Sequence, residues 1–322
     1  MRFNNLKISL KKRTRIFLFG LGGTFIFINL LYFYVPRFVV EVKNPFIETA
    51  RIYILNEPKI QIKQKNDIIN FYWEGYQNTK LNANLYKSLQ QPARATIILI
   101  HGIRSQKENW DNIARFLQKN GYNAIAIDLR AHGQSEGTFC TFGYYEKQDI
   151  AALIKYIHSQ LQLNTPIGIW GHSLGGVISL QTLAVQPDIK FGIIESAYSD
   201  FKQITNRYSK NYLPFESEMF HEFLIERAGE IAEFEPEKVN PEDFIPQIRQ
   251  PVLFLHGEND NKIPLEHALK NLKNIKHHDK KIIIVKNANH YNIWEEGGSK
   301  LQQQILVFFE NSLKQTNVNY PL

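Results

Sequence analysis

A serine between two glycines is the residue whose surroundings best suit it to chemistry. Ser173 lies in the pattern Gly-His-Ser-Leu-Gly at 171–175, which follows an apolar run at 167–170 and precedes a stretch with helical spacing. A serine nucleophile has to project from a tight turn, and a glycine two residues away on each side leaves room for the crowded backbone. The pattern therefore predicts a nucleophile at Ser173.

An acid and a base follow this serine along the chain. A serine hydroxyl is a weak nucleophile at neutral pH, so it needs a base, and the base needs a group that orients it. Asp260 and His290 each come shortly after an apolar run of the kind that forms a buried strand. The order Ser173, Asp260, His290 predicts a triad of nucleophile, orienting acid and base. Glu258 is a weaker candidate for the acid.

Acyl transfer by such a triad also needs hydrogen-bond donors for the oxyanion that forms at the substrate carbonyl. One donor should be the backbone N–H of Leu174, at the helix start directly after the nucleophile. The second should come from the loop after the run 95–100, where we expect the N–H of Ile103. Arg104 could touch an anionic group of the substrate, although a solvated loop arginine is the more common case.

The elements that must position these residues are strands and helices in alternation. The predicted strands are 67–73 and 81–86, as an opening antiparallel pair, then 95–100, 123–127, 167–170, 191–194, 252–255 and 282–285. The predicted helices are 109–119, about 150–157, about 174–185, one beginning near Pro264 and a last one through Phe308. This alternation indicates an α/β fold, with a mostly parallel sheet flanked by helices and a ligand site at the carboxyl ends of the strands.

One interval breaks the alternation. Residues 200–245 contain no predicted strand but many aromatic and acidic side chains, which favours a helical insertion placed where it could cover the site. We expect a catalytic domain at 41–322, with this helical lid at about 200–245. Residues 1–40 form a separate N-terminal region.

The N-terminal region has the pattern of a transmembrane anchor. Residues 16–35 carry no charged side chain, and about twenty helical residues span the roughly 30 Å of a bilayer's hydrocarbon core. Aromatic residues cluster at the far end, and Pro36 is expected to stop the helix. A cleaved signal peptide is the main alternative, but its apolar part is usually shorter and ends at small residues. A buried core helix is less favoured, because the segment is apolar all round.

The positive charge of the chain is concentrated at its start. The 322 residues carry a net charge of +7, and six cations lie in the first fifteen residues, which contain no acid, leaving +1 for the rest. The remainder therefore has no general basic patch, which argues against a nucleic-acid partner. The same cations predict a single-pass topology with a cytoplasmic N-terminus and an extracytoplasmic catalytic domain, periplasmic or exterior in a bacterium.

Taken together, these residues resemble the α/β-hydrolase superfamily, in particular the small-lid serine hydrolases of the Bem46-like and serine-aminopeptidase-like groups. The matching pieces are His101-Gly102, the run 128–135, the turn at Ser173, the run 195–200, the run 251–257 with Asp260, Ile263-Pro264 and Asn289-His290. Ala131 stands where the family's turn usually carries glycine. The resemblance covers about 67–309 and implies hydrolysis of esters, thioesters or sometimes amides without a metal or organic cofactor.

We therefore expect a membrane-anchored serine hydrolase that cleaves a small-molecule or lipid acyl ester through an acyl-enzyme. An aspartate in place of Ser173 would instead have indicated a dehalogenase or an epoxide hydrolase. A single cysteine, Cys140, excludes an internal disulfide, and no metal-ligand spacing is present. A peptidase or acyltransferase with the same triad stays open, and so, less favoured, does a catalytically silent binding module.

Overall fold

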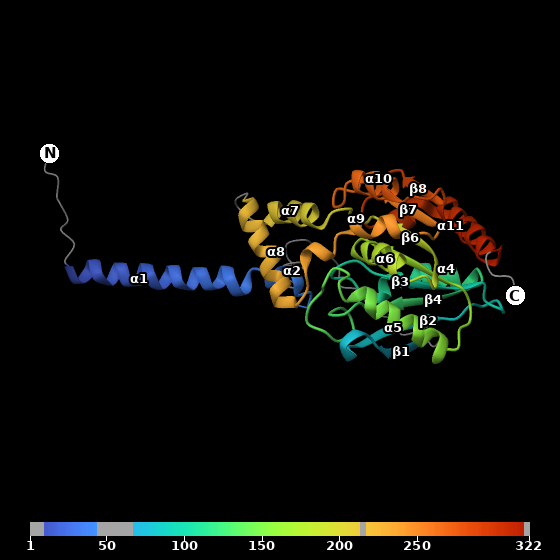
Figure 1. Cartoon of the computed structure of the whole chain (residues 1–322), viewed down its shortest axis with the longest axis horizontal. Coiled ribbons are helices and arrows are strands. Elements are labelled where there is room, and N and C mark those ends of the chain that lie inside the picture. Colours follow the sequence, from blue (N-terminus) through green and yellow to red (C-terminus); the bar gives the residue numbers. More distant parts are fainter. Residues whose placement is uncertain (1–9, 44–66, 213–216, 319–322) are drawn as a thin grey trace.

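A single eight-stranded sheet forms the centre of the protein (Figure 1). The computed structural model describes residues 10–43, 67–212 and 217–318. The strands are β1 (Ile69–Glu74), β2 (Lys80–Tyr86), β3 (Ala95–Ile100), β4 (Tyr122–Ile127), β5 (Ile167–His172), β6 (Ile189–Glu195), β7 (Val252–Gly257) and β8 (Lys280–Val285). Every predicted strand is present, and no boundary differs from its prediction by more than two residues.

The sheet is mostly parallel, as the alternation predicts. Its order is β1-β2-β4-β3-β5-β6-β7-β8. β2 pairs antiparallel with both β1 and β4, and every later pairing is parallel. The carboxyl ends of β3, β5, β6, β7 and β8 therefore meet at one edge, which is where the loops that carry the candidate residues begin.

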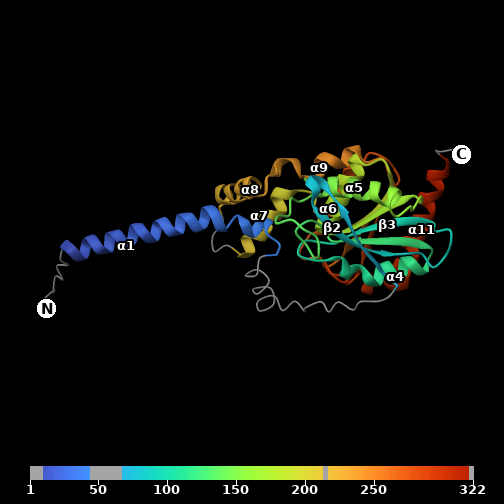
Figure 2. The same cartoon turned by 90° about the horizontal axis from the view of Figure 1, so that it is seen from below.

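Helices cover both faces of the sheet (Figure 2). The covering helices are α4 (Asp111–Lys119), α5 (Glu146–Ser159), α6 (Leu174–Val185), α10 (Leu265–Asn274) and α11 (Ile293–Val318). Alternate residues of β3 divide between two hydrophobic clusters: Ile98 and Ile100 pack with α5 and α6, whereas Ile97 and Leu99 pack with α4 and α11. All six residues of β3 are buried, because a strand covered on both faces has no solvent side.

Where the structure describes it, the interval between β6 and β7 forms helices and short helical turns, as the sequence predicts. It contains α7 (Phe201–Tyr212), α8 (Glu218–Ala232), the short turn η4 (Pro236–Lys238), α9 (Pro241–Phe244) and the turn η5 (Ile245–Gln247). The Oγ of Ser217 caps α8 by accepting a hydrogen bond from the N–H of Phe220 at 3.2 Å. Glu233 ends the helix in the left-handed conformation.

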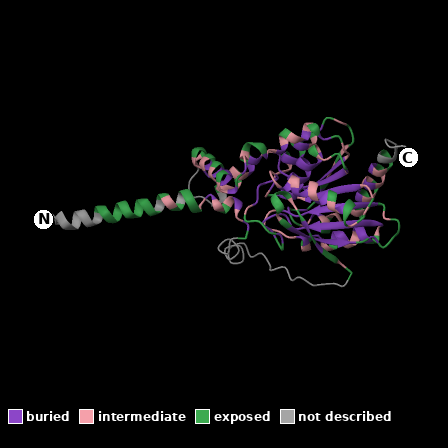
Figure 3. Cartoon of the chain, turned by 60° about the horizontal axis from the view of Figure 1, so that its bottom comes forward, coloured by how far each residue is buried: buried purple, intermediate pink, exposed green. Residues whose placement is uncertain are grey.

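The N-terminal region begins with an exposed helix. α1 (Leu10–Asn29) extends away from the sheet and leads into a π-helical turn, η1 (Leu30–Tyr34), and a short helix, α2 (Arg37–Val40) (Figures 1 and 3). The uncharged stretch 16–35 is thus divided between α1, whose first turns carry basic residues, and η1. Within the described ranges, no helix is both long enough and apolar enough to cross a membrane, so the predicted transmembrane span is not confirmed.

Candidate active site

Ser173 sits on a sharp turn between β5 and α6. Its backbone has φ 55° and ψ −117°, a conformation that residues other than glycine rarely adopt. The neighbouring glycines make the turn sterically possible. A Cβ added at Gly175 would lie 2.1 Å from the carbonyl oxygen of Ile100, and one at Gly171 would lie 2.0 Å from that of Gly175. The turn therefore brings Ser173 to the carboxyl edge of the sheet.

Three residues from separate loops converge at this edge. The Nε2 of His290 lies 3.1 Å from the Oγ of Ser173, and its Nδ1 lies 2.8 Å from the Oδ2 of Asp260. Because a carboxylate accepts, Nδ1–H donates to Asp260, and the lone pair of Nε2 is directed at the serine hydroxyl. The structure thus brings together the three side chains that the sequence places after β5, β7 and β8.

Asp260 is held as a carboxylate. Its Oδ1 accepts hydrogen bonds from the backbone N–H groups of Lys262 and Ile263, each at 2.9 Å. Burial raises the pKa of Asp260, but the hydrogen bond and charge of His290, with the Ile263 amide, outweigh it and hold the pKa below its ordinary value. The negative charge that orients His290 is therefore present at neutral pH.

His290 is neutral at the pH where most enzymes work. Burial lowers the pKa of its imidazole to about 4, against the opposing effect of the hydrogen bond to Asp260. His172 also holds this loop, because its Nε2–H donates to the carbonyl oxygen of His290 at 2.8 Å. An imidazole that is neutral, buried and fixed on two sides can accept a proton from Ser173 without reorganising.

The loop after β3 lies directly against the nucleophile. A Cβ added at Gly102 would lie 3.2 Å from the Cβ of Ser173. Among the described residues, the N–H groups of Ile103 and Leu174 make no hydrogen bond. Ile103 directly follows Gly102, and Leu174 directly follows Ser173. An amide donor without a partner, close to a serine nucleophile, is the kind of group that holds the oxygen of a substrate carbonyl.

Two histidines hold this loop in place. The Nδ1–H of His101 donates to the carbonyl of Gly102 at 2.7 Å, and its Nε2 accepts from the N–H of Leu129 at 3.1 Å. His132, in the loop after β4, makes the same pair of contacts. Its Nδ1–H donates to the carbonyl of Arg130, and its Nε2 accepts from the N–H of Arg104. Both rings need one protonated and one bare nitrogen, and burial lowers both pKa values accordingly.

A buried ion pair that was not predicted from the sequence also holds the loop after β3. The Nζ of Lys107 lies 2.7 Å from the Oδ2 of Asp128 and 3.2 Å from the Oε1 of Gln134. Asp128 also accepts from the backbone N–H groups of Lys107 and Gln134. Asp128 belongs to one of the motifs in the sequence, but nothing near Lys107 in the chain marks it as buried.

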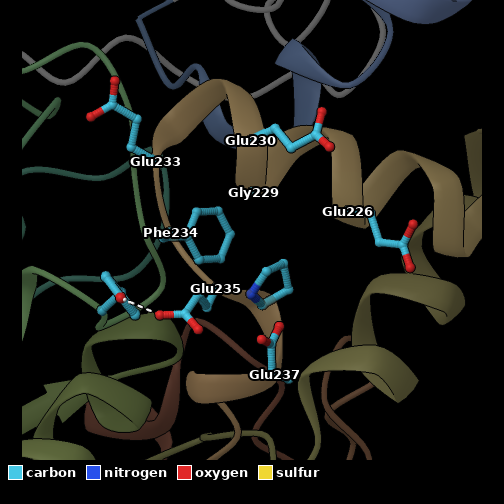
Figure 4. Close-up of a pocket in the computed structure, with 9 residues that line it drawn as sticks. Glu226, Gly229, Glu230, Glu233, Phe234, Glu235 and Glu237 are labelled. Carbon is cyan, nitrogen blue, oxygen red and sulfur yellow. Dashed lines mark hydrogen bonds between the residues drawn. The ribbon is translucent and has the colours of Figure 1, made fainter.

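Two surface cavities lie away from these residues. The first, of about 470 Å³, lies between α8 and η4 and has five glutamates around its rim (Figure 4). The second, of about 520 Å³, lies beside Gly75 and α5. Neither includes Ser173, Asp260 or His290. Within the described part of the chain, no group of three His, Cys, Asp or Glu side chains is arranged to hold a metal ion.

Comparison with known proteins agrees with this architecture. A family model described as serine aminopeptidase, S33, matches residues 91–231. The chain is 26% identical over 221 residues to the uncharacterized protein YqkD of Bacillus subtilis, covering 67% of this chain and 71% of that one. It is 24% identical over 284 residues to the lysophosphatidylserine lipase ABHD12 of Danio rerio, covering 79% of this chain and 70% of that one.

Solved esterase structures share the fold. The Pyrococcus furiosus esterase Pf2001 superposes with a TM-score of 0.64 at 21% identity, covering 79% of this chain and 96% of the esterase. Est1E of Butyrivibrio proteoclasticus, solved with ferulic acid bound, gives a TM-score of 0.58 at 22% identity, covering 76% of this chain and 99% of that one.

Proposed function

Because the chain belongs to the α/β-hydrolase superfamily, we propose that it is a serine hydrolase that cleaves carboxylic ester or thioester bonds. One observation carries the proposal: an unbroken series of hydrogen bonds runs from Asp260 through His290 to Ser173, with distances of 2.8 and 3.1 Å. The esterase neighbours and the lipase relative favour an ester among the acyl substrates that such a site could take.

The proposed reaction has two halves. In the first, the Oγ of Ser173 attacks the acyl carbonyl while Nε2 of His290 takes its proton, and Asp260 stabilises the imidazolium that forms. The N–H groups of Ile103 and Leu174 hold the oxyanion of the tetrahedral intermediate. His290 then protonates the leaving alcohol or thiol. In the second half, His290 deprotonates a water molecule that attacks the acyl-enzyme, and the carboxylic acid is released.

Replacement of the nucleophile tests this proposal. Ser173→Ala should abolish turnover of p-nitrophenyl esters and labelling by a fluorophosphonate, because only an activated serine forms the phosphonyl adduct. Ser209→Ala is the matched control, since the hydroxyl of Ser209 donates within its own helix, to the carbonyl of Asn206. Undiminished labelling of Ser173→Ala would reject the assignment. Failure of the native protein to react with any probe would favour a silent binding module.

A peptidase is the second candidate function, favoured by the description of the matching family model as a serine aminopeptidase. The same triad would then release an amine in place of an alcohol, with His290 as the proton donor. Product analysis with matched ester and peptide substrates separates the two. Addition of a short alcohol also reveals acyltransfer, since transfer yields a new ester at the expense of the free acid.

We further propose that the substrate is a lipid acyl ester and that residues 16–35 anchor the protein in lipid. Large apolar side chains of α1, among them Phe17, Phe19 and Phe25, are exposed on a helix that stands clear of the sheet. The proposed topology has the N-terminus in the cytoplasm and the catalytic domain outside. We expect detergent to extract the protein from membranes and alkaline carbonate to leave it there. A reporter fused after Asn44 that proves cytoplasmic would overturn the orientation.

A further inference from the structure

The last part of the N-terminal region packs onto the catalytic domain. Residues 32–43, called the strap here, fold onto the domain even though they lie more than twenty residues before β1. Val40 is fully buried in the larger hydrophobic cluster, and Val42 is 5% exposed. The N–H of Cys140 donates to the carbonyl of Val40 at 2.9 Å. The strap is therefore part of the core of the domain.

The strap also contacts the helical insertion. The guanidinium of Arg227, on α8, lies 4.1 Å from the centre of the Tyr32 ring, and its Nε donates to the carbonyl of Tyr32 at 3.4 Å. The ring of Phe223 on the same helix lies 6.1 Å from that of Tyr32. The position of α2 beside α8 is visible in Figure 1. The strap thus joins the insertion to the rest of the domain.

A third contact reaches the loop that carries the proposed oxyanion donor. The Nη2 of Arg104 donates to the carbonyl of Phe38, in the strap, at 2.8 Å. The backbone N–H of Arg104 donates to Nε2 of His132 at 3.1 Å. Arg104 adopts φ 55°, a left-handed conformation that residues other than glycine rarely adopt. Arg104 is therefore held at both ends in a strained conformation, directly after Ile103.

We propose that Arg104 is a positioning residue, which fixes the direction of the Ile103 N–H by tying the loop after β3 to the strap. The inference rests on the proposed function and adds to it a dependence of catalysis on the N-terminal segment. Arg104 acts through the backbone of its neighbour. Its Nη2 donates to the carbonyl of Phe38, so the guanidinium contacts the strap.

Kinetics of the full chain test this role. Arg104→Met should lower kcat for p-nitrophenyl butyrate about tenfold with KM changed less than twofold, a fraction of the 10²–10³ lost when an oxyanion donor is removed. Arg104→Lys should recover at least a third of kcat, because its ammonium can still donate to Phe38. Arg94→Met is the matched control, since Arg94 pairs with Glu310 at the surface. Its kcat should not change.

The strap itself supplies the second test. Val40→Ala opens a cavity beneath the strap and should lower kcat about threefold, whereas Val252→Ala, at the amino end of β7, should leave it unchanged. All rates are expressed per active site, titrated by the p-nitrophenol burst. The double variant Val40→Ala, Arg104→Met should be no slower than Arg104→Met alone, because both changes release the same tie.

The outcomes separate this inference from the proposed function. Wild-type turnover that is lost in Ser173→Ala supports the function whatever the Arg104 variants do. A kcat of Arg104→Met within twofold of wild type overturns the inference, and so does a change in KM alone, which would mark a substrate contact. Multiplication of the two effects in the double variant also overturns it. If Arg104→Met does not fold, an unchanged kcat in Val40→Ala is sufficient to reject the tie.

Discussion

The Nζ of Lys107 and the Oδ2 of Asp128 lie 2.7 Å apart, and the lysine side chain is only 1% exposed. Glu108 lies 3.0 Å from the same ammonium. The pair holds the loop after β3 against the turn after β4, because the backbone N–H of Lys107 also donates to Asp128. Removal of Lys107 would leave the Asp128 carboxylate in the interior without a counter-charge, whereas removal of Asp128 would leave the ammonium paired with Glu108 alone.

Lys107→Met should therefore lower the free energy of unfolding by about 3–5 kcal/mol, as measured by urea denaturation. The double change Lys107→Met, Asp128→Asn should recover part of that loss, because no buried charge is left unpaired. The control is Arg94→Met, whose surface pair contributes about 0–1 kcal/mol. A loss for Lys107→Met no larger than for this control would contradict the prediction.

Asp260→Asn should lower kcat by about 10⁴ while leaving the melting temperature nearly unchanged. The amide of asparagine is close in size to the carboxylate but can present N–H to His290, which favours the wrong tautomer. Glu258→Gln, changed in the same loop, is the matched control and should retain activity. Full loss in Glu258→Gln with activity retained in Asp260→Asn would reassign the acid to the residue that the sequence ranks second.

The pH dependence of kcat/KM follows from the pKa of His290. The imidazole must be neutral to accept the serine proton, and burial lowers its pKa to about 4. Activity should therefore persist below pH 6 and fall by half near pH 4, with a slope of one proton. The measurement is kcat/KM against pH with an ester whose own hydrolysis is slow in acid. A half-point at the ordinary value, near 6.5, would contradict the buried geometry.

Stability should depend on pH through the histidines that hold the loop after β3. Burial lowers the pKa of His132 well below its ordinary value, and His101 lowers it further. As pH falls below about 6.5, the histidines of the unfolded chain bind protons, whereas the buried histidines of the folded protein stay neutral. The free energy of unfolding therefore decreases. Urea denaturation at pH 7.5 and 5.5 measures the change. His132→Gln, which keeps an acceptor for Arg104, should show a smaller decrease, and an equal one would contradict the assignment.

The fold was predictable because its signals are local. The continuous apolar run of β3 has six residues, and the strand, turn and helix around Ser173 lie together within residues 167–185. Such runs reveal burial on both faces without knowledge of what covers them. The carboxyl ends of parallel strands share one edge, so the loops bearing Asp260 and His290 could also be placed near Ser173.

Other features could not be predicted, because they depend on partners distant in the chain. A lysine in a polar loop is normally exposed, and Lys107 is buried only because Asp128, 21 residues away, supplies the opposite charge. Val40 follows an apolar stretch with the pattern of an anchor, yet it is buried in the core, and its carbonyl accepts a hydrogen bond from the N–H of Cys140. The contact of Arg104 with Phe38 spans 66 residues and leaves no periodic pattern in either segment.

The amino-acid sequence alone determined which segments become strands and helices, their order, and the edge of the sheet at which polar loops gather. Only the tertiary structure decided that Nε2 of His290 lies 3.1 Å from a hydroxyl 117 residues earlier, and that Val40 and Val42, which precede the first strand, lie in the hydrophobic core of the domain. The physical reason is the range of the forces involved. Periodicity reports burial within a few residues, whereas a distance between loops depends on how the helices and strands of the whole domain pack together.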